Sequence, residues 1–337
     1  MSRLVMRAVG PVDDVVHLED EGDLRPEAGE VLVDMEAANI NLTDFRQAEG
    51  TYTDRVRSDP PRPLGGEGAG RITALGPGVE ETLLGRRVIV VPTYDQGTWA
   101  HRLIAPLHSV YPVGEDTASD QLAMLASNPA TAHQLLHRYV DLKPGDWVIQ
   151  DMANSAAGQY VIQLASEAGV RTLNIVRRPE AAAPLHDLGA DAVLVDGADL
   201  TGRIARVLGE QRARLVLDGV GGELPGRLAA FAEDGATVVS YSSLTRTPVA
   251  IPAALLVYRE LQVRGFWIVN WLRESPRADI EAVYASLDAL AAKGRLTASV
   301  QDTFALHDYR AAFDAARRPQ RSGKVVFDLT LRTREGK

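Results

Sequence analysis

The chain has 337 residues, a formal net charge of −9 at pH 7 and no cysteine, so disulfides, thiolate catalysis and cysteine-ligated zinc are excluded. The acidic balance argues against a general nucleic-acid or membrane-surface role, and no long uncharged apolar segment predicts a membrane span. The N-terminal residues lack the apolar core of a signal peptide, so we expect a soluble, cytoplasmic protein of two domains.

The first 120 residues predict a strand-rich domain punctuated by glycine and proline. Alternating apolar residues predict a strand that faces a core with Val31, Val33 and Met35, and a second short strand is expected at residues 87–91. Residues 39–52 are mostly polar, and we predict that they lie outside the core. The glycines of residues 63–80 predict tight turns and close backbone approach.

From about residue 120 the composition predicts alternating helices and strands, led by a strand, turn, helix and strand between Trp147 and Arg178. Trp147–Gln150 and Thr172–Val176 are β-prone runs. The helix between them has an apolar stripe of Val161, Leu164, Ala165 and Ala168, and Gly169 suits its end. The turn before the helix is built from small residues, namely Ala153, Ser155, Ala156, Ala157 and Gly158.

Small residues at this turn leave the backbone N–H groups of a helix N-terminus open to a pyrophosphate. The turn therefore predicts a nucleotide-binding unit in outline. It has a single glycine where G-x-G-x-x-G has three, so an ordinary tightly packed strand–helix turn remains an alternative.

Arg177 and Arg178 follow the second strand of this unit, where dinucleotide folds meet the adenosine ribose. An acid there favours NAD, whereas two guanidiniums on a 2′-phosphate would contribute ~1.5–3 kcal/mol each. The pair therefore predicts NADPH as the cofactor. The alternative is two solvated surface arginines.

The rest of the chain continues this alternation. Strands are predicted at residues 215–217, which lead into Asp218–Gly222, at residues 237–241, which lead into Ser242 and Ser243, and at residues 261–267 and 324–329. An amphipathic helix ended by Gly294 is predicted from Ile280, Val283, Tyr284, Leu287 and Leu290, and a further helix at residues 306–316.

Several stretches, in this order, resemble the medium-chain dehydrogenase/reductase superfamily: NINLTDF, LGGEGAG, SNPATAH, the Gly158 turn, DGVGG and SGKVV. A narrower likeness is to the 2-enoyl thioester reductases of mitochondrial fatty acid synthesis. It is carried by GTY at Gly50–Tyr52, GTWAHR at Gly97–Arg102, SNPATAHQLL at Ser127–Leu136, ANSAAGQYVIQLA, LNIVR and RGFW at Arg264–Trp267.

The resemblance implies an α/β architecture with two domains. A catalytic domain built on a GroES-like β-barrel would occupy residues 1–122 and be completed by residues 269–337. A Rossmann domain with a doubly wound parallel sheet would occupy residues 123–268. The active site is then expected in the cleft between the domains.

Many members of the superfamily are zinc alcohol dehydrogenases, but this chain departs from their ligand pattern. Asn41 stands where their cysteine ligand would fall, and Gly66 where their histidine would, just before Glu67. His133 and His137 are four residues apart on a predicted helix but lack a third partner, so a surface or helix-packing role is expected. We predict a zinc-independent enzyme with no metal site.

Reduction of a conjugated thioester without a metal needs a hydroxyl donor for the charge that builds on the thioester oxygen. Tyr52 matches the catalytic tyrosine of the enoyl thioester reductases, which makes it the expected donor. A tyrosine that packs at the end of a loop is the alternative. Zinc-free quinone reductases also carry a tyrosine near this position, so Tyr52 leaves the substrate open.

The resemblance also implies the remaining contacts. Asn128 and Thr131 would meet the nicotinamide carboxamide, although SNPAT is also a plain helix start with an early proline. Lys324 would lie near the cofactor phosphates, or in solvent at the start of a strand. The other implied cofactor contacts are Asn154, Ser155, Ala156, Ala157, Gly158, Arg177, Arg178, Tyr241, Ser242, Phe266 and Trp267.

The resemblance implies that the substrate contacts are Asn41, Phe266 and Trp267. The two aromatic residues are expected in the last Rossmann strand, where they would line an acyl pocket. The same strand would form the edge along which two copies pair as a homodimer. Ordinary core packing is the alternative for both aromatics. Ala156 is a departure, because family members have a glycine there. It puts the phosphate geometry in doubt.

These observations predict an NADPH-dependent, zinc-independent reductase of 2-enoyl thioesters carried on CoA or acyl carrier protein. Two alternatives remain. A quinone or small enone reductase would use the same metal-free fold. A non-catalytic NADPH-binding member, kept as a structural, RNA-binding or interaction protein, is disfavoured by Tyr52, by both arginines and by the net acidity.

Overall fold

The computed structural model describes residues 1–56, 59–94, 96–242, 246–319 and 323–331, so Ser243 lies outside the described residues. The chain divides into two compact units, residues 1–127 with 272–337 and residues 128–271. We refer to them as the outer unit and the inserted unit. The expected boundaries were after residues 122 and 268. No helix in the described ranges is long and apolar enough to span a membrane.

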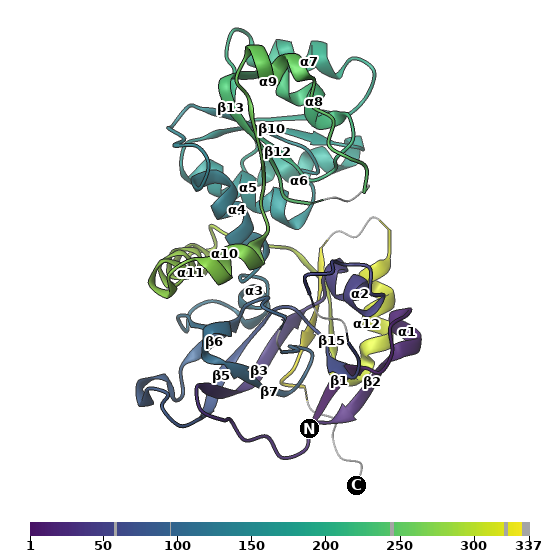
Figure 1. Cartoon of the computed structure of the whole chain (residues 1–337), viewed down its shortest axis with the longest axis vertical. Helices are drawn as coiled ribbons and strands as arrows, with labels where there is room; N and C mark the ends of the chain where they lie inside the picture. Colours follow the sequence, from purple (N-terminus) through teal and green to yellow (C-terminus); the bar gives the residue numbers. More distant parts are fainter. Residues whose placement is uncertain (57–58, 95, 243–245, 320–322, 332–337) are drawn as a thin grey trace. The chain divides into compact units, whose positions relative to one another are not determined.

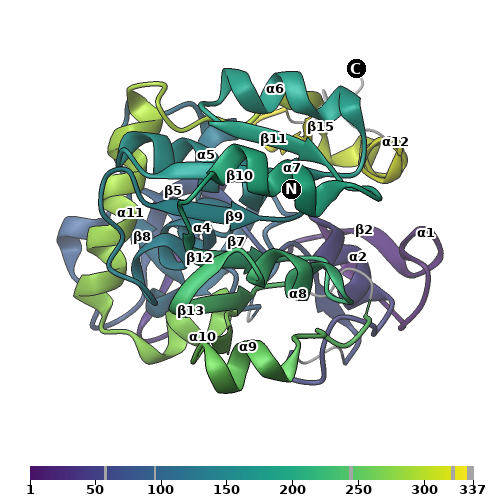
Figure 2. The same cartoon turned by 90° about the horizontal axis from the view of Figure 1, so that it is seen from above.

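The inserted unit, teal to green in Figure 1, is built on a six-stranded parallel sheet in the order β11-β10-β9-β12-β13-β14. Its strands are β9 (Trp147–Gln150), β10 (Arg171–Val176), β11 (Ala192–Val195), β12 (Ala213–Asp218), β13 (Ala232–Ser240) and β14 (Gln262–Gly265). This order reverses direction between β9 and β12, as in doubly wound dinucleotide-binding folds. Strands β9 to β13 of this sheet are labelled in Figure 2.

Helices cover both faces of this sheet. They are α4 (Asn128–His137), α5 (Ala156–Glu167), α6 (Ala182–Asp187), α7 (Leu200–Leu208), α8 (Leu224–Ala229) and α9 (Ala253–Tyr258), while α10 (Ile268–Glu274) runs across the boundary between the units. On one face α7 and α8 bury Ile204 and Leu228 against Ile149. On the other, α5 and α6 bury Ile162 and Leu185 beside Val176. The predicted doubly wound α/β fold is confirmed.

The unit between β9 and β10 follows the prediction closely, with one correction. Val161, Leu164 and Ala165 are buried on the sheet-facing side of α5. Ala168 was expected in this stripe, but it is exposed, because the helix ends at Glu167 and Ala168 is its C-cap. Gly169 then takes a φ of +67°, the left-handed conformation that favours glycine after a helix.

The outer unit contains a seven-stranded sheet and a three-stranded sheet. The larger has the order β15-β16-β3-β5-β6-β8 with β7 also paired to β3, and the smaller has the order β2-β1-β4. Their strands are β1 (Ser2–Met6), β2 (Val16–Asp20), β3 (Glu30–Asn39), β4 (Arg62–Pro63), β5 (Gly68–Leu75), β6 (Arg87–Val90), β7 (Arg102–Pro106), β8 (Val110–Pro112), β15 (Val300–Ala305) and β16 (Lys324–Asp328). Its helices are α1 (Val12–Val15), α2 (Leu42–Ala48), α3 (Ser119–Leu122), α11 (Arg277–Ala292) and α12 (Tyr309–Arg317).

The core of the outer unit corrects the prediction for residues 39–52. These residues include α2, whose Phe45 is 4% exposed and packs edge-on against Phe313 at a ring-centroid distance of 5.4 Å. Ala48 is also buried, because residues three apart share one face of a helix. The segment therefore belongs to the core, and its polar side chains line the site described below.

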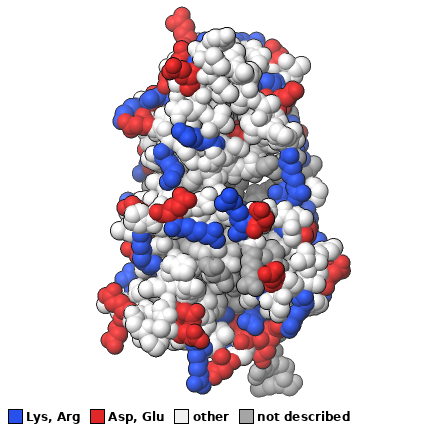
Figure 3. Space-filling view, viewed as in Figure 1, with Lys and Arg blue, Asp and Glu red and all other residues white. Residues whose placement is uncertain are grey.

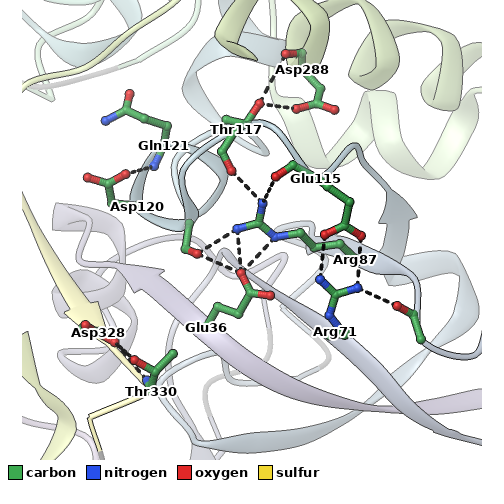
Figure 4. A network of polar contacts seen from close by, with 12 residues as sticks. Glu36, Arg71, Arg87, Glu115, Thr117, Asp120, Gln121, Asp288, Asp328 and Thr330 are labelled. Carbon is green, nitrogen blue, oxygen red and sulfur yellow. Dashed lines mark hydrogen bonds and ion pairs between the residues drawn. The ribbon is translucent and has the colours of Figure 1, made fainter.

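Within the outer unit, a polar network around Arg87 ties the C-terminal part of the chain to the N-terminal part (Figure 4). The guanidinium of Arg87 donates to a carboxylate oxygen of Glu36 at 2.6 Å and to the Thr117 carbonyl at 2.6 Å. The Thr117 hydroxyl in turn donates at 2.6 Å to Asp288 on α11. The network joins β3, β6 and the segment before α3 to a helix 171 residues further along the chain.

Two further predicted elements differ from the structure. The strand expected at residues 237–241 begins at Ala232 and ends at Ser240. The strand expected at residues 261–267 ends at Gly265, so Phe266 and Trp267 lie beyond it, before α10. The helix predicted around Ile280, Tyr284 and Leu287 is α11, which buries these three side chains.

Candidate active site

The carboxyl ends of β9 and β12 meet where the order of the parallel sheet reverses, which is where ligands of such sheets bind. The turn after β9 leads into α5, a helix of 12 residues. Ser155 caps this helix, with its side-chain oxygen accepting from the Gly158 N–H at 3.1 Å. The cap fixes the helix start and leaves the first-turn N–H groups directed at this end of the sheet.

Gly158 is required here by close packing rather than by its backbone angles. A Cβ atom at this position would lie 2.6 Å from the Ala153 carbonyl oxygen, so a side chain would push the helix away from the turn. Ala156 and Ala157 follow the cap at the helix start, and Asn154 is exposed. The predicted small-residue turn is therefore a tight strand–helix junction, and its contact with a pyrophosphate stays a prediction.

Arg177 and Arg178 follow β10 and are both exposed. They lie at the carboxyl edge of the sheet, because β10 is parallel to β9 and pairs with it. Within the residues that the structure describes, neither guanidinium forms an ion pair. Two cations at the edge that carries the α5 N-terminus suit an anionic ligand.

Two buried carboxyl groups at the same edge were not expected from the sequence. Asp151 follows β9 and Asp218 ends β12, and both are fully buried. Asp151 accepts from the Gly219 N–H at 2.7 Å, and Asp218 accepts from the Gly221 N–H at 2.7 Å. Burial, with a smaller effect of Asp218, raises the pKa of Asp151 to about 8. One indication of this arrangement is present in the sequence, namely Asp218 and Gly219 at the start of the DGVGG stretch.

Tyr241 and Ser242 come after β13, and both are half-buried. The Tyr241 hydroxyl is buried, and a Cβ at Gly219 would lie 3.1 Å from it. Burial is the main cause that raises the pKa of Tyr241, and the neighbouring Asp151 carboxyl raises it further. This predicted cofactor residue thus lies with the two carboxyl groups at the sheet edge.

The other predicted residues of the inserted unit lie on α4 and after β14. Asn128 and Thr131 are half-buried in the first turn of α4. Phe266 is buried and its N–H donates to the Ser240 carbonyl at 2.9 Å, while Trp267 is half-buried. Their contacts with a cofactor or a substrate stay predictions.

In the outer unit, Tyr52 is half-buried beside Tyr94. The two rings meet edge-on, with centroids 5.7 Å apart and planes at 68°. The Tyr94 hydroxyl donates to the Tyr52 hydroxyl at 3.5 Å. Tyr94 was not among the predicted site residues, because nothing in the spacing of the sequence links positions 52 and 94.

The outer unit also contains a buried polar network around Glu67. Glu67 is fully buried and accepts from Asn41 at 2.7 Å, from Asn39 at 3.0 Å and from the Ser127 N–H at 2.8 Å. The Lys324 ammonium donates to the Asn41 side-chain oxygen at 2.6 Å. The structure thereby brings together two predicted site residues, Asn41 and Lys324, that are 283 positions apart.

Burial dominates the ionisation of the acids in this network. It raises the pKa of Glu67, against the opposing effect of the Lys324 charge. Burial also raises the pKa of Asp44 to about 7, although its carboxylate accepts from the Asn41 N–H at 2.8 Å. The Asp44 carboxyl therefore loses its proton near neutral pH rather than near pH 4.

The positions that match the zinc ligands of the superfamily do not form a metal-binding set. Asn41 is engaged by Glu67 and by the Lys324 ammonium, a cation that a metal ion would have to displace. Among the described residues, no group of three or more His, Asp or Glu side chains could hold a metal ion. His133 and His137 stack at 4.2 Å on α4, and burial lowers the pKa of His133 to about 4.

Comparisons with known proteins agree with this architecture. A family model described as an alcohol dehydrogenase GroES-like domain matches residues 27–114, and one described as a zinc-binding dehydrogenase matches residues 156–297. The mitochondrial enoyl-acyl-carrier-protein reductase of Dictyostelium discoideum is 31% identical over 316 residues, covering 90% of this chain and 87% of that protein.

Solved structures share the fold, among them the following two. A protein assigned as an NADPH:quinone reductase in Bacillus thuringiensis has a TM-score of 0.88 and 23% identity, over 97% of this chain and 98% of that one. The Candida tropicalis enoyl thioester reductase Etr1p, in a complex with NADP and crotonyl-CoA, has a TM-score of 0.82 and 24% identity. That match covers 97% of this chain and 99% of the other.

The predicted combination of a GroES-like domain with a Rossmann domain is confirmed by the two family models and by these folds. At under 25% identity, the structures establish the fold alone. The sequence relative goes further, because it is 31% identical along nine tenths of the chain. The chain therefore belongs to the medium-chain dehydrogenase/reductase superfamily and, within it, to the family of mitochondrial-type 2-enoyl thioester reductases.

Proposed function

We propose that the protein reduces the C=C bond of 2-enoyl thioesters, carried on CoA or acyl carrier protein, with NADPH as the electron donor. The observation that carries this proposal is the half-buried Tyr52 hydroxyl, paired with a second tyrosine hydroxyl, in a chain 31% identical to an enoyl-acyl-carrier-protein reductase. A paired phenol in a partly buried site is suited to donate a hydrogen bond to developing negative charge.

The inserted unit has the features that NADPH needs. The capped α5 N-terminus suits the pyrophosphate, and Gly158 keeps the helix close to the turn. The exposed guanidiniums of Arg177 and Arg178, at the same edge, suit a 2′-phosphate. When bound, NADPH supplies a hydride to the β-carbon and leaves as NADP⁺, while a proton taken up at the α-carbon completes the saturated acyl thioester.

Tyr52 has two tasks in this reaction. Its hydroxyl donates a hydrogen bond to the thioester oxygen, on which negative charge builds as the double bond is lost. It is also the source of a proton for the α-carbon. The reaction is zinc-independent, because the Lys324 ammonium and the Glu67 carboxylate hold Asn41 where a zinc ligand would be needed.

Quinone or enone reduction is the second candidate. It is favoured by the fold match to the protein assigned as an NADPH:quinone reductase, which has a TM-score of 0.88. The same cofactor and the same tyrosine would serve a flatter substrate. The sequence identity to that protein is 23%, below that to the enoyl reductase, so the thioester is the preferred substrate.

We also infer that two copies of the chain pair along β14, the last strand in the sheet order. All four residues of β14 are exposed, including the apolar Val263 at 44%, and an exposed sheet edge can pair with the edge of a second chain. The nearby helix α9 exposes Val257 and Tyr258. Light scattering should give twice the chain mass of 36.4 kDa, and a single chain mass would contradict the pairing.

The experiment for the proposed function compares wild type with Tyr52→Phe, following NADPH oxidation in the presence of crotonyl-CoA and a chelator. Wild type is expected to turn over, and the variant to lose roughly 10²-fold in kcat, the usual cost of one lost oxyanion donor. A variant as active as wild type would remove Tyr52 from the reaction. A wild type that binds NADPH but reduces neither crotonyl-CoA nor a quinone would indicate a non-catalytic protein.

A further inference from the structure

Tyr94 has an unusual backbone conformation for a tyrosine. It follows β6 by four residues and has a φ of +63°, in the left-handed region that side chains other than glycine rarely adopt. Such a conformation costs free energy and persists where the surroundings hold it in place. Neighbouring groups must therefore hold Tyr94 in this conformation.

Contacts from three segments hold Tyr94. The Arg62 guanidinium donates to the Tyr94 carbonyl at 2.6 Å. The ring lies against the backbone of Gly66, where an added Cβ would come within 3.1 Å of the Tyr94 ring and 3.2 Å of an Asp44 oxygen. The third contact is the edge-on packing with Tyr52. These contacts direct the Tyr94 hydroxyl at the Tyr52 hydroxyl.

The Tyr94 hydroxyl lies between two other hydroxyl groups. It donates to Tyr52 at 3.5 Å, and the Thr43 side chain of α2 lies on its other side. Burial raises the pKa of Tyr94 well above its ordinary value, so Tyr94 keeps its proton and stays a donor. A distance of 3.5 Å is long, as is common for catalytic hydrogen bonds before the substrate binds.

We propose that Tyr94 is a positioning residue for Tyr52, donating to its oxygen so that the Tyr52 proton is directed away from Tyr94 and toward the substrate. The donation stabilises the charge that Tyr52 gains as its own proton moves away, because hydrogen bonds in a chain strengthen one another. Asp44 and Arg62 are the charged groups that face this pair. The inference rests on the proposed role of Tyr52.

The test is a double-mutant cycle on the full chain, with NADPH and crotonyl-CoA. Tyr94→Phe keeps the ring and removes only the hydroxyl, so kcat should fall roughly fivefold, the value of one net hydrogen bond, while KM stays within about twofold. In the Tyr52→Phe background, the same change should have no further effect, because its partner is absent. Tyr309→Phe, another mostly buried tyrosine of the outer unit, is the matched control and should match wild type.

The results that would contradict this inference can be told apart from those that would contradict the proposed function. If Tyr94→Phe has the wild-type kcat while Tyr52→Phe is impaired, the inference is wrong and the proposed function stands. If Tyr94→Phe lowers kcat equally in both backgrounds, Tyr94 acts independently of Tyr52 and the inference is again wrong. If wild type itself does not turn over crotonyl-CoA, the proposed function fails and this inference fails with it.

A second variant keeps the test open if Tyr94→Phe does not fold. Thr43→Val removes the hydroxyl that neighbours Tyr94 while preserving the side-chain shape. It should lower kcat in the same direction but by less, about twofold, because it acts on Tyr52 only through Tyr94. A Thr43→Val enzyme with unchanged kcat would contradict the proposal that the polarity around Tyr94 supports Tyr52.

Discussion

Asp151 and Asp218 place two carboxyl groups out of water at the carboxyl edge of the parallel sheet. Each accepts a backbone N–H of the glycine-rich segment after β12, so the pair holds that segment in place. Burial raises the pKa of Asp151 to about 8, so this carboxyl keeps its proton at neutral pH. The short strand before Asp151 gave no indication that the next residue would be buried.

Asp151→Asn should stabilise the protein in a pH-dependent way. The pKa of Asp151 is raised from 3.8 to about 8 by burial, so the folded chain holds a proton that the unfolded chain has lost between these values. The stability contributed by wild-type Asp151 therefore falls as pH rises through this window. Asparagine keeps the acceptor for Gly219 without ionising.

The gain in Tm for Asp151→Asn should be absent near pH 4, grow up to about pH 8 and then stay constant, as measured by thermal unfolding across pH. The exposed Asp187, changed to asparagine, is the control and should show no such trend. A gain that is the same at pH 4 and pH 8 would show that Asp151 is already ionised in the folded protein.

At the scale of elements, the sequence predicts the β9, α5 and β10 unit well because its apolar spacing is regular over a long stretch. It fails for α2, because a helix of seven residues carries few apolar positions and its polar side chains belong to a buried network. The end of β14 was placed too late. Phe266 still donates to Ser240 as a strand residue would, although the strand ends at Gly265.

Removing both cations after β10 tests the cofactor assignment of this edge. Arg177→Ala with Arg178→Ala should weaken the preference for NADPH over NADH, measured as the ratio of kcat/KM values, by roughly 10²-fold or more. Activity with NADH should change little, because NADH lacks the 2′-phosphate. Arg212→Ala, an exposed arginine just before the amino end of β12, is the control, and its ratio should equal that of wild type.

An unchanged ratio in the double variant would mean that the two guanidiniums are ordinary solvated surface groups. On the face shown in Figure 3, lysine and arginine side chains are interspersed with acids. The Arg212→Ala control separates the loss of one such surface cation from the loss of the pair after β10. A loss of preference confined to the double variant would assign the 2′-phosphate to this edge.

At the scale of the whole molecule, the family resemblance predicts the architecture, including the return of the chain to its first domain. Contacts between distant positions could not be predicted. Asn41 and Lys324 meet across 283 positions, and Thr117 and Asp288 across 171, because the sheet order and not the spacing brings them together. The Tyr52–Tyr94 pair is of the same kind.

The central claim is that the substrate is an enoyl thioester. The most direct measurement compares kcat/KM for crotonyl-CoA with that for a simple quinone, using NADPH and wild-type protein in the presence of a chelator. The thioester should be preferred by roughly tenfold or more, because the proposed role of Tyr52 is to donate to the thioester oxygen as negative charge builds there. A preference for the quinone, or turnover of the quinone alone, would contradict the account.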